Sequence, residues 1–179
     1  MKVIVINGHA QSGKSTFVSM CKDYPGVDVY EFSMGDAVKA MAKVIGWDES
    51  QKSPRDRKFL SDLKDLIEDY NDGAYEYVKY LIDNFVPDNV AGPQVVFIHA
   101  RNIEDINRLV KDYNARTLVI RRKFVEGIQL ENRADTGWWT PDYDYAVNNN
   151  DGLKFLRKNS EDFMEYILSE DWEYEKGEN

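Results

Sequence analysis

The chain has 179 residues and carries 23 Lys and Arg against 32 Asp and Glu, which gives a formal net charge of −9. Binding to DNA or RNA needs a basic face that neutralises phosphates, so a nucleic-acid partner is not expected. The single cysteine, Cys21, excludes an intramolecular disulfide, and no run approaches the roughly 20 apolar residues of a membrane helix. We therefore expect a cytoplasmic, single-domain protein that binds small molecules rather than polyanions.

Short apolar or alternating runs that predict strands are separated by segments whose apolar residues recur at helical spacing. The predicted strands cover 3–6, 27–32, 95–98, 117–120 and 146–147. The predicted helices cover 15–22, 38–45, 55–70, 75–85, 103–113 and 153–168. Strands separated by helices predict βαβ units and an α/β fold with a parallel sheet covered on both faces. In such folds ligands bind at the carboxyl ends of the strands.

The segment after the first strand matches the phosphate-binding pattern G-x-x-x-x-G-K-[ST]. Its glycines let the backbone approach phosphate oxygens, Lys14 reaches the β- and γ-phosphates, and the Ser15 hydroxyl binds Mg²⁺. The motif lies between a predicted strand and a predicted helix, which is the context that it requires. It therefore predicts a nucleotide-binding P-loop. The residues assigned to it are Gly8, Ala10, Gln11, Ser12, Gly13, Lys14, Ser15 and Thr16.

Asp36 and Lys39 lie where the second predicted strand gives way to a helix. Asp36 could cap that helix, accept a hydrogen bond from a substrate hydroxyl or hold a metal-bound water, and Lys39 could meet a phosphate. The alternative is a capping aspartate beside a surface lysine. The sequence leaves both interpretations open.

The layout of these motifs resembles the nucleoside monophosphate kinase family, most closely the phage-type deoxynucleoside monophosphate kinases. The resemblance rests on the P-loop, on Gly35-Asp36 with a basic residue three positions later, on a helical insertion, and on arginines after the third and fourth strands. It implies a three-layer P-loop fold with a five-stranded sheet in the order 2-3-1-4-5. It also implies a helical substrate-binding insertion over about 46–94 and a lid over about 121–142. The activity implied is phosphoryl transfer from ATP, with Mg²⁺, to a nucleoside or deoxynucleoside monophosphate.

The same resemblance assigns roles to several basic residues. Arg101 would bridge the donor and acceptor phosphates, and arginines of the lid would close over the transferring group. The backbone around Asn148 would line the adenine pocket, where Asn148 would either touch the base or only fix the turn. Arg57 and Lys58 are expected to hold the acceptor phosphate, since basic residues at a helix start oppose its dipole and such conflicts often mark function. The site residues expected beyond the P-loop are Asp36, Lys39, Arg57, Lys58, Asp62, Arg101, Arg121, Arg122, Arg133 and Asn148.

Two features depart from the family pattern. Lys39 stands where adenylate kinases carry arginine, and no aspartate ends the third strand to position Mg²⁺. His99, which ends that strand, is expected to be a hydrogen-bonded core residue. Two other functions stay open: a P-loop kinase that acts on a hydroxyl, for which Asp36 and Asp62 are the candidate bases, and a nucleotide-binding regulatory module. The sequence also leaves open the base and sugar of the acceptor and whether the chain forms a homodimer.

Overall fold

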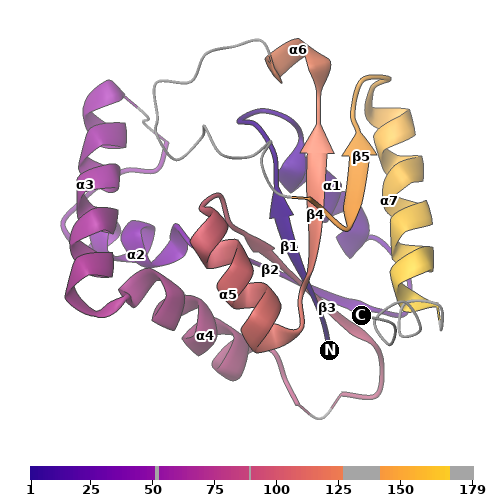
Figure 1. The fold of residues 1–179 in the computed structure, drawn as a ribbon, viewed down its shortest axis with the longest axis horizontal. Helices are drawn as coiled ribbons and strands as arrows, with labels where there is room; N and C mark the ends of the chain where they lie inside the picture. Colours follow the sequence, from indigo (N-terminus) through magenta and orange to yellow (C-terminus); the bar gives the residue numbers. More distant parts are fainter. Residues whose placement is uncertain (51–52, 89, 127–141, 170–179) are drawn as a thin grey trace. The chain divides into compact units, whose positions relative to one another are not determined.

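The computed structural model describes residues 1–50, 53–88, 90–126 and 142–169, and the chain forms two compact units. Unit 1 consists of Met1–Glu31 and Ala91–Asn179, and unit 2 consists of Phe32–Val90. Figure 1 shows the sheet and helices that make up unit 1 and the helices that make up unit 2. Unit 1 therefore contains the P-loop motif, and unit 2 contains most of the predicted helical insertion.

Five strands form one sheet in the order β2-β3-β1-β4-β5, which confirms the order predicted for a P-loop fold. The strands are β1 (Lys2–Asn7), β2 (Asp28–Ser33), β3 (Gln94–His99), β4 (Arg116–Arg121) and β5 (Tyr145–Asn148). β1 runs parallel to both β3 and β4, and β4 runs parallel to β5. The register places Ile6 opposite His99 on one side and Leu118 on the other. The P-loop thus begins between the carboxyl ends of two neighbouring strands.

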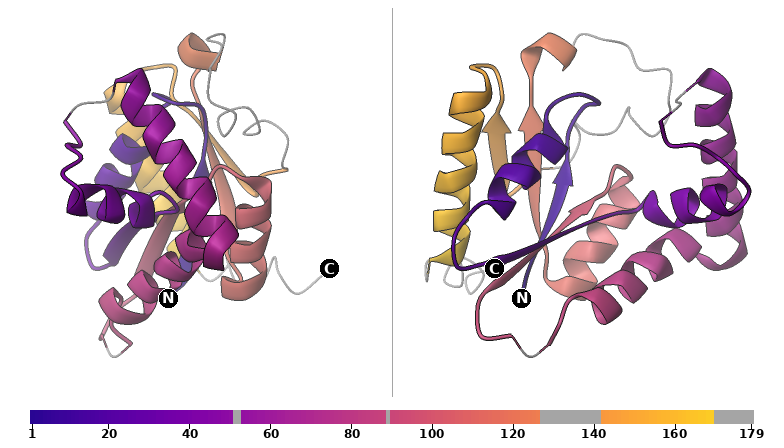
Figure 2. Two further views of the ribbon diagram at one scale, coloured as in Figure 1. Left: turned by 90° about the vertical axis from the view of Figure 1, so that its left-hand side faces the viewer. Right: turned by 180° about the vertical axis from the view of Figure 1, so that it is seen from behind.

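Helices cover both faces of this sheet, as the sequence pattern predicts. The helices of unit 1 are α1 (Lys14–Lys22), α5 (Ile103–Tyr113), α6 (Lys123–Glu126) and α7 (Leu153–Leu168). α1 and α7 share one core with alternate strand residues such as Ile4 and Ile6, and in it the rings of Phe17 and Phe163 meet edge to face at 5.6 Å. α5 covers the opposite face: it lies in front of the sheet in Figure 1, whereas α1 lies in front in the rear view of Figure 2. Residues Val3 to Ile6 of β1 are at most 3% exposed, as expected for a continuous apolar strand covered on both sides.

Unit 2 is built from α2 (Asp36–Val44), α3 (Pro54–Asn71) and α4 (Gly73–Phe85), which pack on one another. Its buried side chains include Val38 of α2, Ile67 of α3 and Tyr75 of α4. Helical spacing places the apolar residues of α3, up to Tyr70, on one stripe, but Ile67 is the buried residue of that helix and Tyr70 is 86% exposed. Helical spacing shows which side chains share a face, whereas burial depends on how much of that face a neighbour covers.

The start of α3 is stabilised by a capping box that the sequence analysis missed. The Ser53 hydroxyl accepts a hydrogen bond from the Asp56 amide at 3.2 Å, and the Asp56 carboxylate accepts one from the Ser53 amide at 2.9 Å. Pro54 occupies the first helical position, where no amide hydrogen is needed. The carboxylate of Asp56 also complements the helix dipole, which offsets the nearby basic residues. The pattern Ser-Pro-x-Asp was a readable signal for this helix start.

No helix within the described ranges is both long enough and apolar enough to cross a membrane.

We predict that Ser53→Ala lowers the free energy of unfolding by about 1 kcal/mol, because the first-turn amides lose their acceptor. Urea unfolding followed by circular dichroism measures the change. Ser61→Ala, at an exposed position within the same helix, is the matched control and should not destabilise the protein. Equal unfolding midpoints for both variants would show that the capping box contributes nothing.

Candidate nucleotide-binding site

The P-loop connects β1 to α1 through a backbone path that requires glycine. Gly8 has φ 138° and Gly13 has φ 103°. Residues with a Cβ atom rarely adopt such positive φ angles, whereas glycine adopts them readily. A Cβ on Gly8 would lie 2.3 Å from the carbonyl oxygen of Ile120 in β4, so no larger residue fits against this strand. Gln11, in the middle of the loop, adopts φ 63°. The loop therefore holds a tight and locally strained shape, as expected where backbone amides surround a phosphate.

The amino-terminal end of α1 is suited to bind an anion. Gly13 occupies the N-cap position, and no side chain caps the first-turn amides there. Ser15, the second residue of α1, is exposed, and its hydroxyl makes no hydrogen bond to any described residue. A phosphate at this position would accept hydrogen bonds from the amides and benefit from the helix dipole.

Lys14 lies folded over the loop that it is predicted to serve. Its ammonium donates hydrogen bonds to the carbonyl oxygens of Gly8 at 2.6 Å and His9 at 2.8 Å. These contacts hold the positive charge against the loop backbone at Gly8 and His9. From this position the flexible side chain can reach the phosphates of a bound nucleotide.

Three side chains outside the motif brace the loop. Asn7 accepts a hydrogen bond from the Gly8 amide at 2.7 Å and donates one to the hydroxyl oxygen of Tyr143 at 2.8 Å. Burial raises the pKa of Tyr143 to about 12, so its hydroxyl keeps its proton at physiological pH. At the other end of the loop, the Asn149 side-chain amide donates to the Ser12 carbonyl at 2.8 Å. A Cβ on Gly13 would lie 2.4 Å from the same amide nitrogen, so Asn149 packs directly on the loop.

The structure places several of the predicted cationic residues in unit 1. Arg122, just after β4, donates a hydrogen bond to the Gln11 carbonyl at 3.3 Å, and its guanidinium lies 5.8 Å from the ring centre of Phe124. Arg121 ends β4, and Arg101 follows β3; both are exposed. These positions keep the side chains at the carboxyl edge of the sheet. Arg133 and most of the predicted lid lie outside the described residues.

Asn148, which the resemblance assigns to the adenine pocket, ends β5 and is exposed. Its carbonyl oxygen accepts a hydrogen bond from the Asn159 side chain at 3.3 Å. The neighbouring Asn149, which the sequence analysis passed over, is the residue that touches the loop. Both stand in the run Asn148-Asn149-Asn150, and only the three-dimensional packing distinguishes them.

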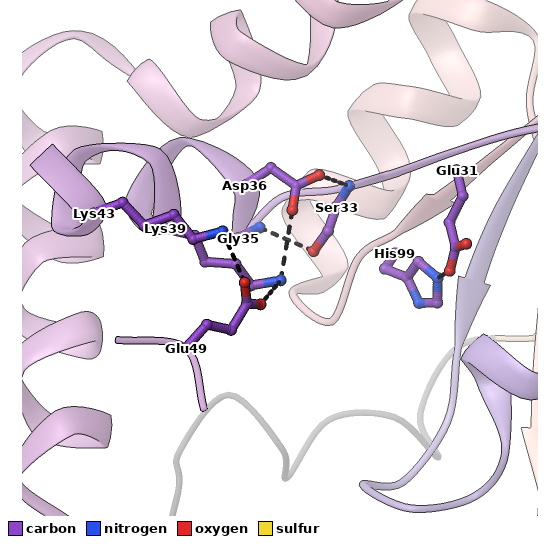
Figure 3. Close-up of polar contacts among 8 residues, drawn as sticks. All are labelled: Glu31, Ser33, Gly35, Asp36, Lys39, Lys43, Glu49 and His99. Atoms are coloured by element: carbon purple, nitrogen blue, oxygen red, sulfur yellow. Dashed lines mark hydrogen bonds and ion pairs between the residues drawn. The ribbon is translucent and has the colours of Figure 1, made fainter. Parts of the chain in front are cut away.

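Glu31, inside β2, and His99, the last residue of β3, form a polar pair (Figure 3). The Nε2 atom of His99 lies 2.9 Å from Oε1 of Glu31, and the Lys22 ammonium lies 2.6 Å from Oε2. The hydrogen bond from His99 is the main cause that lowers the pKa of Glu31 from 4.5 to about 2. His99 is therefore hydrogen-bonded, as predicted. Its partner Glu31, within an alternating strand, carried no sequence signal.

Unit 2 holds the remaining predicted residues. Figure 3 shows the Asp36 carboxylate turned back toward Ser33, whose amide donates to it at 2.7 Å. Lys39 lies 3.6 Å from both Asp36 and Glu49, and Lys43 lies 2.8 Å from Glu49. The carboxylate of Glu49 thus bridges two lysines of α2.

On α3, three predicted residues occupy exposed positions near the helix start. Lys58 and Asp62 form an ion pair with each other at 2.6 Å, one helical turn apart. Arg57 makes no hydrogen bond or ion pair with any described residue. An exposed pair of this kind stabilises a helix by only about 0.3–0.5 kcal/mol, so its residues can exchange partners readily.

Comparisons with known proteins identify the fold. No protein-family model matches the chain, and no curated protein matches it significantly. Among solved structures, the Mycobacterium tuberculosis APS kinase CysC in complex with AMPPNP and APS superposes with a TM-score of 0.53 at 14% identity, covering 94% of this chain and 98% of that chain. Shikimate kinase from Aquifex aeolicus vf5 gives a TM-score of 0.49 at 16% identity, covering 98% and 99%. The superposition on the APS kinase structure, together with the strand order, shows that the chain has a three-layer α/β fold of this kind.

We predict that Asn149→Ala weakens binding of ATP·Mg²⁺ about tenfold, which corresponds to about 1.4 kcal/mol, because the Ser12 carbonyl loses its donor and the loop loses its shape. Isothermal titration calorimetry measures the change. Asn107→Ala, at an exposed position on α5, is the matched control and should bind like the parent protein. An unchanged dissociation constant for Asn149→Ala would show that the loop holds its shape without this contact.

The Glu31 pair also predicts a pH dependence of stability. The pKa of Glu31 is lower in the folded state, so its contribution is complete above the unfolded value of 4.5 and disappears as the pH falls toward about 2. The difference in unfolding free energy between the parent protein and Glu31→Gln should therefore shrink over that range. Urea unfolding at several pH values measures it, with Glu161→Gln on the exposed face of α7 as control. A difference that is the same at pH 3 and at neutral pH would contradict the prediction.

Proposed function

We propose that this protein transfers the γ-phosphoryl group of ATP to a small-molecule acceptor. The observation that carries the proposal is the P-loop itself: two glycines with positive φ, an uncapped helix start, and the Lys14 ammonium held 2.6 Å and 2.8 Å from loop carbonyls. Phosphoryl transfer needs little covalent chemistry from the protein. Its main requirements are positioned phosphates and positive charge where negative charge spreads in the transition state.

In this proposal Lys14 and the loop amides bind the β- and γ-phosphates, and Arg122 contacts the transferring group from its place on the loop. Mg²⁺ fits the exposed Ser15 hydroxyl, which has no hydrogen-bond partner among the described residues. Those residues contain no group of three His, Cys, Asp or Glu side chains that could hold a metal. Ser15 would therefore share the ion with the nucleotide phosphates, where it neutralises their charge.

The family resemblance proposes a nucleoside or deoxynucleoside monophosphate as the acceptor. Arg57, Lys58, Lys39 and Arg101 are the residues that would bind its phosphate. Arg57 has no partner in the described part of unit 2, and the Lys58 pair is exposed, so both are accessible to an anion. An acceptor phosphate oxygen is already nucleophilic, so this reaction needs no general base.

A hydroxyl acceptor is the second candidate, and one observation favours it. A hydroxyl must lose a proton as it attacks phosphorus, which requires a base. His99 ends β3, at the edge of the sheet where ligands bind in this kind of fold, and it is hydrogen-bonded to Glu31 inside β2.

We expect ADP production from ATP·Mg²⁺ to rise at least tenfold over the ATP-only background when the right acceptor is added. A coupled assay with ribo- and deoxynucleoside monophosphates, and with the corresponding nucleosides, measures this. Lys14→Ala should lower kcat by about 100-fold or more while the circular dichroism spectrum stays unchanged. Lys154→Ala, an exposed lysine at the start of α7, is the matched control. Turnover that survives Lys14→Ala would remove the P-loop from the mechanism.

A further inference from the structure

We infer that His99 is the general base of the transfer reaction, that Glu31 positions it, and that the acceptor is therefore a hydroxyl compound. The inference rests on the proposed phosphoryl transfer from ATP and names the acceptor class for it. The family resemblance points instead to a phosphate acceptor, and it assigns no base.

Both side chains of the pair lie on the face of the sheet that carries α1, and His99 ends the strand next to β1, which leads into the P-loop. Side chains alternate along a strand, and Val29 of β2 and Phe97 of β3 both pack into the core formed with α1 and α7. Glu31 and His99, two residues further along each strand, therefore point to the same face. In the sheet register His99 lies opposite Ile6 of β1, and Ile6 comes two residues before Gly8, the first glycine of the P-loop. The Ala100 amide also donates to the Ile6 carbonyl at 3.4 Å, so the chain stays paired with β1 up to the start of the loop.

The contacts of the pair determine which nitrogen of His99 can act as a base. An ionised carboxylate only accepts hydrogen bonds, so Nε2 of His99 carries the hydrogen in the 2.9 Å contact with Glu31. Nδ1 then holds the unprotonated lone pair and has no hydrogen-bond partner among the described residues. The His99 side chain is 17% exposed, so it is not fully sealed from solvent.

The surrounding charges suit this role. Glu31 of β2 is the charged group in direct contact with His99 in the described structure, and Lys22 of α1 contacts the other oxygen of Glu31 at 2.6 Å. A carboxylate next to an imidazole fixes its tautomer and stabilises the imidazolium that forms when it takes a proton. Lys22 in turn holds the carboxylate in place and keeps it ionised.

In the proposed step the acceptor oxygen attacks the γ-phosphorus of ATP while its proton moves to Nδ1 of His99. A new bond forms between the acceptor oxygen and phosphorus. The bond between phosphorus and the β–γ bridging oxygen breaks, and ADP leaves with that electron pair. The imidazolium, held by Glu31, returns its proton to solvent after the product departs.

A first experiment tests the tautomer without any acceptor. The chain has only two histidines, so ¹⁵N-labelled protein gives a simple imidazole spectrum in which His9→Gln identifies the His99 signals. We expect neutral His99 to carry its hydrogen on Nε2 and to show an unprotonated Nδ1. A hydrogen on Nδ1 would overturn the inference.

A second experiment identifies the product. The full-length protein is incubated with ATP·Mg²⁺ and either nucleosides or nucleoside monophosphates, and ³¹P NMR distinguishes a phosphomonoester from a diphosphate. The inference requires a new phosphomonoester on a carbon-bound oxygen. A diphosphate product would overturn the inference yet leave phosphoryl transfer from ATP intact. The proposed function itself fails on a different pair of results. ADP formation that no acceptor increases would mean that the phosphoryl group goes to water, and equal ATP binding by Lys14→Ala and the parent protein would mean that the P-loop does not bind the nucleotide.

Variants of the pair complete the test. His99→Gln keeps a donor near Glu31 but has no base, so kcat should fall at least 100-fold while KM for ATP changes less than twofold. Glu31→Gln replaces the carboxylate with an amide that can accept or donate, so neutral His99 should lose its preference for the hydrogen on Nε2 in the ¹⁵N spectrum, and kcat should fall while KM for ATP changes less than twofold. A purely structural pair would change stability and leave kcat and the tautomer unchanged. Asp162→Asn, which breaks the exposed ion pair with Lys158 on α7, is the control and should change neither quantity. Unchanged kcat in His99→Gln would overturn the inference.

Discussion

The close approach of the P-loop to β4 is the constraint on which the site of unit 1 depends. Gly8 passes so near the Ile120 carbonyl that a Cβ would lie 2.3 Å from its oxygen, and Gly13 meets Asn149 in the same way. These contacts fix the loop between the sheet and the turn that precedes α7. A loop held in this way keeps its shape, which is the condition under which backbone amides stabilise negative charge effectively.

Positive charge is gathered locally in a chain that is acidic overall. Lys14 and Arg122 both contact carbonyl oxygens of the P-loop, whereas the net charge of the chain is −9. Elsewhere in unit 1 the negative charge of Glu31 on β2 is paired with Lys22 of α1 and with His99 of β3. The partly buried charges of the site are thus compensated by partners of opposite sign or by backbone dipoles, which keeps their desolvation tolerable.

Sequence periodicity predicted the helices and strands well because each strand of unit 1 is a short apolar or alternating run. An asparagine directly before the predicted helix over 103–113 is typical of a helix cap, and the Asn102 side chain accepts a hydrogen bond from the Glu104 amide at 3.1 Å. The prediction for α3 was weaker. Its apolar residues share a face, yet Leu66 remains 68% exposed. Helical periodicity cannot show how much of a face the neighbouring helices cover.

The sequence by itself determined the P-loop motif and the buried strands, because both follow from local patterns: glycines where φ must be positive, apolar runs where strands are buried, and a lysine and serine at fixed spacing. The acidic balance follows from composition alone, whereas the strand order was implied by the family resemblance and by no local pattern. Only the tertiary structure brought Asn149 to Ser12, Asn7 to Tyr143 and Glu31 to His99. These residues are 137, 136 and 68 positions apart, and their meeting depends on strand register and on the turn before α7. A pattern within one segment carries no information about contacts across such distances.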